Sequence, residues 1–436
     1  MKGSLIIFYV FLVLILSFRL YTFYSNQKTY AKGQEVSFET QILSFPKNHV
    51  YYQTVYVSLD KTTKVLIRTD LERQLNYGDY IKVSGSLDIL LLNDRTTIFT
   101  LNNPKIEADL RENNPFLSAT YFIRQKIIDN FNKNLDPVSS SLLLGIVFGI
   151  KGNMPKDFLE KIQISGVMHV IAASGMNVTM VSGFLFYLLG SLVKRQIAIT
   201  LSIFGVIFYT ALAGFEPSII RAALMGIIVF SAQILGRQQY SLHTLLITAF
   251  LMLFLWPQFL FDNGFSLSFT ATAGILYIPL LLKKFKNQFT EVFITTTSAQ
   301  IATLPILVTN FGNFSLLSIL VNGLVLWTVP ILMILGSIAA FFVFIFSPIS
   351  KLFLYLCLPF LYFFEKTVYF FGSFGPTFNF ENIPWQFSIS YYFFLISLVF
   401  FLNKSSTFFS QSIDSRGKPR GFEKVLDKRH EKVFNS

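Results

Sequence analysis

The sequence predicts a polytopic α-helical membrane protein with a small β domain after its first helix, and three observations support this fold class. Apolar residues make up 53% of the 436 residues and charged residues only 14%, whereas soluble domains carry roughly 25% charged residues. Apolar runs long enough to cross a bilayer recur through residues 165–403. From about residue 30 to 110 the hydrophobic period is two, which is typical of strands. A soluble protein is therefore excluded.

The chain begins with an apolar segment. Residues 4–18 form one apolar run between Lys2 and Arg19, and no small-residue cleavage pattern follows it. We interpret residues 1–25 as an uncleaved membrane anchor helix, with a cleaved signal peptide as the alternative because the apolar core is short.

The next region, residues 26–112, is predicted to be an all-β domain. Its segments 36–40, 54–59, 64–68 and 80–85 alternate between apolar and polar residues or carry β-branched clusters. Four or five short strands fit a small barrel of the OB type.

Residues 113–165 are amphipathic and are expected to lie at the membrane interface. Within them, residues 141–150 are apolar but too short to span a bilayer. A re-entrant or interfacial hairpin is therefore expected here.

Residues 166–403 are predicted to form a multi-helix membrane domain. With the anchor, the apolar runs give about ten membrane helices. The run 315–345 is long for one helix, and Pro330 could divide it. The expected crossings are 168–193, 196–214, 217–236, 240–257, 263–282, 291–309, 315–345, 351–371 and 387–403.

Loop charges predict the orientation of the chain. Basic loops, such as the one at Lys194 and Arg195, alternate with loops that hold Glu216, Asp262 or Glu381, as the positive-inside rule requires. The N-terminus and the basic tail 404–436 are then cytoplasmic, and the β domain lies outside the membrane. The same positive charge could instead bind nucleic acid. The tail is polar enough to be disordered.

One polar cluster precedes or begins the crossing at 168–193, where His169, Ser174, Gly175 and Asn177 follow one another. On a regular helix Ser174 and Asn177 are about 60° apart, but His169 and Ser174 are about 140° apart. A helix break at Gly175 would be needed to pair His169 with Ser174. Packing through small residues with a satisfied histidine is the alternative.

Further polar residues begin or occupy later crossings. Pro217 and Ser218 can begin a helix, and Arg221 lies one turn inside it, either snorkelling to the interface or lining an aqueous path for an anion. Later crossings also begin with or contain polar residues, namely Asp262, Ser268, Gln300 and Asn322. Four such sets favour a polar path through the bilayer.

Several enzyme classes find no support in the sequence. Its four histidines cannot assemble an HExxH or similar metal cluster, and Gly145–Lys151 lacks the spacing of a phosphate-binding loop. The single cysteine, Cys357, forms no intramolecular disulfide and is interpreted as a small buried apolar residue. We expect no catalytic residue, no metal and no cofactor.

The ordered motifs resemble those of the ComEC competence proteins, which carry single-stranded DNA across the bacterial inner membrane during natural transformation. The matching stretches are His169–Gly175, Pro217–Ala222, Gly264–Phe269 and Ala299–Pro305, followed by Asn322. The β domain, with Tyr77-Gly78-Asp79-Tyr80, resembles the family's extracellular OB domain. The resemblance covers roughly residues 30–345.

The resemblance implies a DNA channel rather than an enzyme. Its path would be lined by His169, Ser174, Gly175, Asn177, Pro217, Ser218, Arg221, Asp262, Ser268, Gln300 and Asn322. Tyr51, Tyr52 and Tyr56 could stack bases in the β domain, although core packing is expected for at least half of them. The implied partners are single-stranded DNA, the lipid bilayer, an external DNA receptor or pilus system, a separate nuclease and a cytosolic helicase-type ATPase. No oligomeric state follows.

The sequence departs from the family pattern in two places. Many members continue into a metallo-β-lactamase-like domain, so a short form without it is expected, and Asn177 stands where a second histidine is common. The β domain is also close to neutral, which argues against tight, salt-dependent strand binding. Two other functions stay open: a secondary transporter of an ion or small anionic solute, suggested by Arg221, Glu216 and Asp262, and an intramembrane hydrolase using Ser174 and His169.

Overall fold

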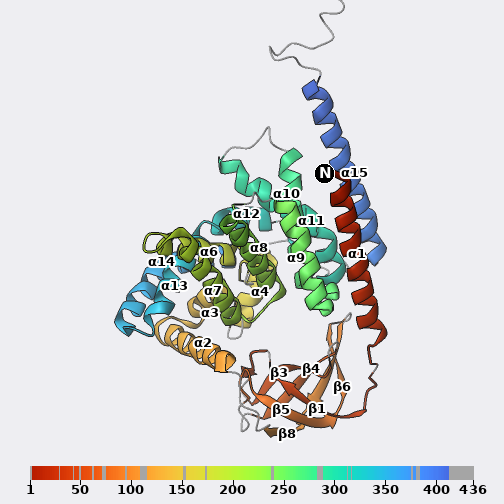
Figure 1. Ribbon diagram of the computed structural model, residues 1–436. Coiled ribbons are helices and arrows are strands. Elements are labelled where there is room, and N and C mark those ends of the chain that lie inside the picture. The colour runs from red at the N-terminus through yellow and green to blue at the C-terminus, as the bar shows by residue number, and fades with distance from the viewer. Residues whose placement is uncertain are drawn as a thin grey trace, which may run out of the picture. The chain divides into compact units, whose positions relative to one another are not determined.

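The computed structural model describes most of the chain as a largely helical protein with a β domain near its N-terminus (Figure 1). The chain divides into two compact units, one of Met1–Phe269 with Phe314–Phe378 and one of Thr270–Asn313 with Asn379–Ser436. The described residues are 2–28, 30–42, 44–48, 51–60, 63–70, 75–93, 96–108, 115–150, 154–171, 174–236, 240–281, 288–311, 313–315, 317–374, 377–379 and 383–411. The predicted tail lies outside them from residue 412 onward.

The predicted anchor forms helix α1 (Lys2–Ser25). Its part Ile6–Ser25 is long and apolar enough to cross a membrane, and none of it is buried by protein. Apolar side chains such as Ile7 and Phe18 point outward, as lipid-facing residues do.

The four strands predicted in the β domain are confirmed as β1 (Glu35–Gln41), β3 (Tyr52–Ser58), β4 (Lys64–Asp70) and β5 (Tyr80–Ser86). They alternate inward and outward residues, so Val55, Ile67 and Val83 are buried in one apolar core. The other strands are β2 (Lys47–Asn48), β6 (Asp88–Asn93), β7 (Thr96–Asn102) and β8 (Lys105–Ala108).

These strands form two sheets. One has the order β2-β3-β4-β7-β6 and the other has the order β1-β5-β8. The pairing of β4 with β7 is parallel, whereas the remaining pairs are antiparallel. A parallel pair between segments joined by a long connection shows that the chain crosses over before β7.

Helices make up the rest of the described chain. The first unit holds α2 (Pro115–Asn134), α3 (Pro137–Phe148), α4 (Lys156–Ser165), α5 (Met168–Ile171), α6 (Gly175–Gly190), α7 (Arg195–Ala213), α8 (Pro217–Ile234), α9 (Ser241–Leu255), the 3-10 helix η1 (Pro257–Phe261), α12 (Ser318–Val325), α13 (Thr328–Phe342) and α14 (Ser347–Phe374). Helix α10 (Asn263–Leu281) begins in the first unit, and the second unit holds α11 (Gln288–Phe311) and α15 (Trp385–Gln411). Two short strands, β9 (Asn313–Ser315) and β10 (Thr377–Asn379), complete the order.

Within the described residues, four helices are long and apolar enough to span a membrane, or five if α12 and α13 form one broken span. The shorter apolar helices are Pro137–Phe148, Gly175–Gly190, Ser241–Leu255 and Trp385–Val399. The count of about ten crossings stays a prediction.

The run 315–345 is divided, but not at Pro330. Helices α12 and α13 bend by 49° at the break between Val325 and Thr328. Pro330 lies in the first turn of α13, where its missing N–H leaves no hydrogen bond unmade.

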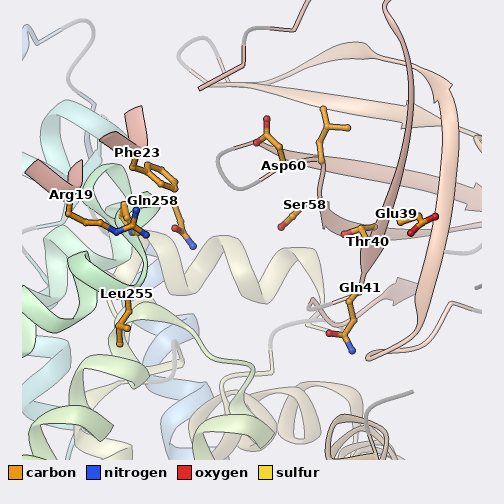
Figure 2. Close-up of a pocket in the computed structure, with 11 residues that line it drawn as sticks. Arg19, Phe23, Glu39, Thr40, Gln41, Ser58, Asp60, Leu255 and Gln258 are labelled. Carbon is orange, nitrogen blue, oxygen red and sulfur yellow. The ribbon is translucent and has the colours of Figure 1, made fainter. Parts of the chain in front are cut away.

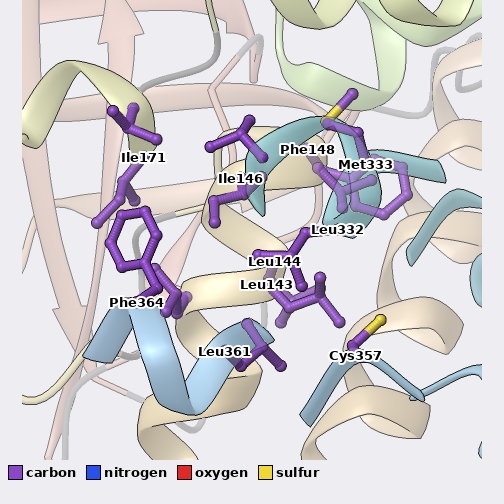
Figure 3. Packing of buried hydrophobic residues seen from close by; sticks show 14 of the residues in the cluster. Leu143, Leu144, Ile146, Phe148, Ile171, Leu332, Met333, Cys357, Leu361 and Phe364 are labelled. Carbon is purple, nitrogen blue, oxygen red and sulfur yellow. The ribbon is translucent and has the colours of Figure 1, made fainter. Parts of the chain in front are cut away.

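Helix α3, in the segment expected to be re-entrant or interfacial, is enclosed by protein, and its position relative to the membrane stays a prediction. Every residue from Ser139 to Phe148 is buried. Figure 3 shows its residues Leu143, Leu144 and Ile146 packed with α13 and α14. A helix that is apolar on all sides is expected to be buried, either in a protein core or in a membrane. Cys357 belongs to the same core and is confirmed as buried.

Candidate functional site

The polar cluster at residues 166–178 contains the helix break that pairing His169 with Ser174 would need. Helix α5 ends at Ile171, Ser174 is extended with ψ of 166°, and α6 begins at Gly175. The Ser174 hydroxyl, however, donates to Oδ1 of Asn177 over 3.0 Å. Its proton is therefore directed to an amide oxygen.

Asn177 also provides a hydrogen-bond donor for the C-terminal end of α3. Its Nδ2 donates to the Ile146 carbonyl over 2.7 Å, and the Tyr209 hydroxyl donates to the next carbonyl, that of Val147, over 2.7 Å. The last carbonyls of a helix have no partner within the helix. Two side chains from α6 and α7 thus satisfy a helix end that water cannot reach, and Tyr209 is a residue that sequence reasoning missed.

Replacing Asn177 by leucine should destabilise the protein by about 1–3 kcal/mol, because it leaves the Ile146 carbonyl and the Ser174 hydroxyl without this partner. Thermal unfolding of the purified protein in detergent would measure the loss. Thr179→Val on the same helix is the matched control, since Thr179 is exposed and its hydroxyl donates only to the Gly175 carbonyl one turn earlier. Equal midpoints for the two variants would contradict this role of Asn177.

Arg221 lies where the sequence predicted, in the second turn of a helix that begins at Pro217. Its side chain is 8% exposed, so it does not snorkel to an interface. Nη1 donates to the Ser268 carbonyl of α10, and the guanidinium lies 5.9 Å from the ring centre of Phe269. Arg221 therefore holds α8 against the start of α10.

Gly175 lies against the same guanidinium. A Cβ atom at Gly175 would lie 2.6 Å from Nη2 of Arg221, which is closer than any carbon side chain allows. The Ser-Gly pair at the start of α6 thus leaves space for the arginine of α8. Three predicted segments, around Gly175, Arg221 and Ser268, meet at one point.

His169 and Asn322 are the two other predicted residues with unusual surroundings. His169 is exposed on the short helix α5, just before the break that leads to α6. Asn322 is 1% exposed, and neither atom of its amide has a hydrogen-bond partner among the described residues. Buried amides are rarely left in this state.

The remaining residues predicted to line the path begin helices or lie in the second unit. Pro217 and Ser218 form the first turn of α8 and are half-buried. Asp262 caps α10, because its Oδ1 accepts the Phe265 N–H over 2.9 Å. Gln300 is half-buried in α11, within the second unit.

The expectation that at least half of the three tyrosines pack in the β core is wrong. Tyr51 is 83% exposed, Tyr56 is 37% exposed, and Tyr52 stacks under Arg68, whose Cζ lies 3.8 Å from the ring centre. The reason is register: β3 turns Gln53, Val55 and Val57 inward, so Tyr52 and Tyr56 face outward.

A cleft of about 580 Å³ lies between the end of α1, the start of η1 and the β domain (Figure 2). Its lining residues are Arg19, Phe23, Glu39, Thr40, Gln41, Ser58, Leu59, Asp60, Leu255, Pro257 and Gln258. Two carboxylates against one guanidinium do not favour a phosphate ligand. Across the part of the chain that the structure describes, no three His, Cys, Asp or Glu side chains could together hold a metal ion.

Comparison with known proteins assigns the helical part of the chain. The family model described as "Competence protein" matches residues 146–405, more than half of the chain. The chain belongs to the competence protein family. This confirms the ComEC-type resemblance, and with the apolar helices it indicates a membrane protein.

Two relatives match this competence protein over parts of their length. It is 28% identical over 218 residues to "ComE operon protein 3" of Bacillus subtilis (strain 168), covering 50% of this chain and 28% of the relative. It is 32% identical over 204 residues to an "Uncharacterized protein" of Aquifex aeolicus (strain VF5), covering 46% of this chain and 48% of the relative. The chain thus spans less than half the length of either relative. No solved structure matches it.

Proposed function

We propose that this competence protein forms an inner-membrane channel through which single-stranded DNA enters the cell during natural transformation. The observation that supports this most is that three of the segments behind the family resemblance, around Gly175, Arg221 and Ser268, converge on one buried guanidinium. A buried cation inside a membrane domain is costly, and such residues mark substrate and ion pathways among other functional sites.

In this proposal the structure represents a closed path. Arg221 donates to a protein carbonyl, and an arriving phosphate would replace that carbonyl as acceptor. His169, which is exposed, and Asn322, whose buried amide has no hydrogen-bond partner among the described residues, are proposed as further contacts for the strand. No covalent step is required of the channel. The hydrogen bond from Ser174 to Asn177 gives a hydrolase mechanism no support.

The β domain would be an OB-type domain that receives the strand outside the membrane. Its parallel β4–β7 pair together with the antiparallel β1–β5 and β6–β7 pairs supports a Greek-key barrel of this type. The outward-facing Tyr52, Tyr56 and Arg68 on β3 and β4 offer aromatic faces and one cation, a combination suited to stacking bases.

We place the β domain outside the cell and the loop between α6 and α7 inside, because loop charges alternate in that sense. In a Cys357→Ser background, cysteines at Lys105 and at Lys194, both exposed, should react with a membrane-impermeant maleimide from opposite sides of intact cells. Labelling of both from the same side would refute this orientation.

Deletion of the gene in a transformable host should abolish internalised labelled DNA while leaving surface-bound DNA unchanged. Internalised DNA is measured as label that resists added nuclease, and a copy of the gene restored in trans serves as the control. The external receptor, separate nuclease and cytosolic ATPase are proposed to be other proteins, so surface binding should persist. Normal internalisation in the deletion strain would overturn the proposal, and reconstituted flux of a small solute that DNA does not affect would favour a secondary transporter.

A further inference from the structure

The β domain contacts the helices through a stack of side chains around Phe45, which lies between β1 and β2. The rings of Phe45 and Tyr77 are stacked, with centres 4.3 Å apart and planes at 18°. The guanidinium carbon of Arg124, on α2, lies 3.6 Å from the centre of the Phe45 ring. Tyr77 is 1% exposed, so this contact is a packed junction.

Arg124 extends the junction to the end of α7. Its Nη1 donates to the Leu212 carbonyl, and its side chain is 9% exposed. Burial lowers the pKa of Arg124 to about 10, while Glu216 opposes this shift, so the guanidinium stays charged at neutral pH. Glu216 is the residue immediately before α8.

Two glycines allow the backbones to approach closely at this junction. At Gly214, with φ of 93°, a Cβ atom would lie 2.9 Å from Cε2 of Phe45. At Gly78, with φ of 95°, a Cβ atom would lie 3.2 Å from Cβ of Leu117 on α2. The β domain is therefore fitted both to α2 and to the turn between α7 and α8.

That turn is strained. Phe215 has φ of 54°, a conformation that costs free energy for a bulky residue and persists only where the surroundings impose it. Its N–H donates to the Thr210 carbonyl over 3.1 Å. Helix α8 starts two residues later at Pro217, and Arg221 follows after one turn.

We propose that Arg124 is a positioning residue: it couples docking of the β domain to the conformation of the α7–α8 turn, and thereby sets the orientation of the α8 segment that carries Arg221. The effects that this inference predicts on DNA uptake rest on the proposed function. The coupling itself is a property of the protein alone and can be measured without DNA.

Hydrogen exchange of the purified full-length protein tests the coupling. Arg124→Gln and, separately, Phe45→Ala should increase amide exchange at least 10-fold over residues 210–221, while α13 in the same unit stays unchanged. Phe45→Tyr should retain wild-type protection because it keeps the ring. Arg19→Gln is the matched control, because Arg19 also donates to a carbonyl, that of Phe254 near the end of α9, but has no contact with this turn.

DNA uptake per protein molecule in the membrane should fall about 10-fold in Arg124→Gln and Phe45→Ala, less in Arg124→Lys, and not in Arg19→Gln. Unchanged amide exchange at residues 210–221 would overturn the coupling. An equal increase in α13 would also overturn it, because it would show that Arg124 merely stabilises the whole unit. If the Arg124→Gln protein does not accumulate, amide exchange in Phe45→Ala tests the coupling, because this variant keeps the hydrogen bond from Arg124 to the Leu212 carbonyl. Local exchange effects in a protein whose deletion leaves DNA uptake normal would support the coupling and reject the proposed function.

Discussion

Replacing Arg221 by alanine should reduce DNA uptake by about 10- to 100-fold while the protein stays in the membrane at its normal abundance. In the proposed path the variant loses the charged hydrogen bond from Arg221 to an arriving phosphate, an interaction of about 1.5–3 kcal/mol, and each ~1.4 kcal/mol corresponds to a factor of ten. It also removes the positive charge that a phosphate would meet. Uptake of nuclease-resistant label, divided by the amount of protein in the membrane, measures the effect.

Arg221→Lys should give an intermediate rate. Lysine keeps the charge and can donate to one carbonyl, but it lacks the planar fork that lies against Gly175 and near Phe269. Arg195→Ala is the matched control, since Arg195 is an exposed arginine at the start of α7. Wild-type uptake in both Arg221 variants would show that the guanidinium has no role in transport.

Replacing Gly175 by leucine should abolish uptake almost as completely as removing the arginine. The new Cβ would lie 2.6 Å from Nη2 of Arg221, and the Cβ of Ala222 is only 3.4 Å away, so the larger side chain must displace the guanidinium from Ser268. Gly175→Ala should be milder, because the atom it meets is the far end of a flexible side chain.

Gly183 provides the control for helix propensity and side-chain size. It lies on the same helix α6, and a Cβ atom there would have no neighbour within 4 Å. Gly183→Leu should therefore leave uptake per molecule within twofold of wild type. Equal defects in the two leucine variants would mean that α6 tolerates no bulk anywhere and that the contact with Arg221 is not special.

The sequence predicted the local features well, because these depend on neighbouring residues. Alternation in residues 36–85 predicted β1, β3, β4 and β5, and Pro217 marked the start of α8. The sequence indicated a break at Gly175 only as the condition for pairing His169 with Ser174, and the structure has such a break before α6. The approach of Gly175 to Arg221 could not be predicted, because it joins segments that are distant in sequence and depends on how α6 and α8 pack.

Arg124 was overlooked although the sequence contained a signal for it. The buried residues of α2 are Leu117, Thr120, Arg124, Ile127 and Phe131, which recur every three or four positions. A charged residue inside an otherwise apolar stripe needs a specific partner. That partner, the Leu212 carbonyl on α7, is separated from α2 by four intervening helices in the chain, so no local pattern could identify it.

The enclosure of α3 also constrains how the protein is made. This 12-residue helix is too short to be inserted as a span, and its carbonyls at Ile146 and Val147 await Asn177 and Tyr209. Its apolar surface packs against α13 and α14, which are synthesised much later, at residues 328–374. Until then α3 is too short to span the bilayer and too apolar to be stable in water. Biosynthesis therefore passes through a long interval in which the N-terminal half depends on the insertion machinery for protection from aggregation and proteolysis.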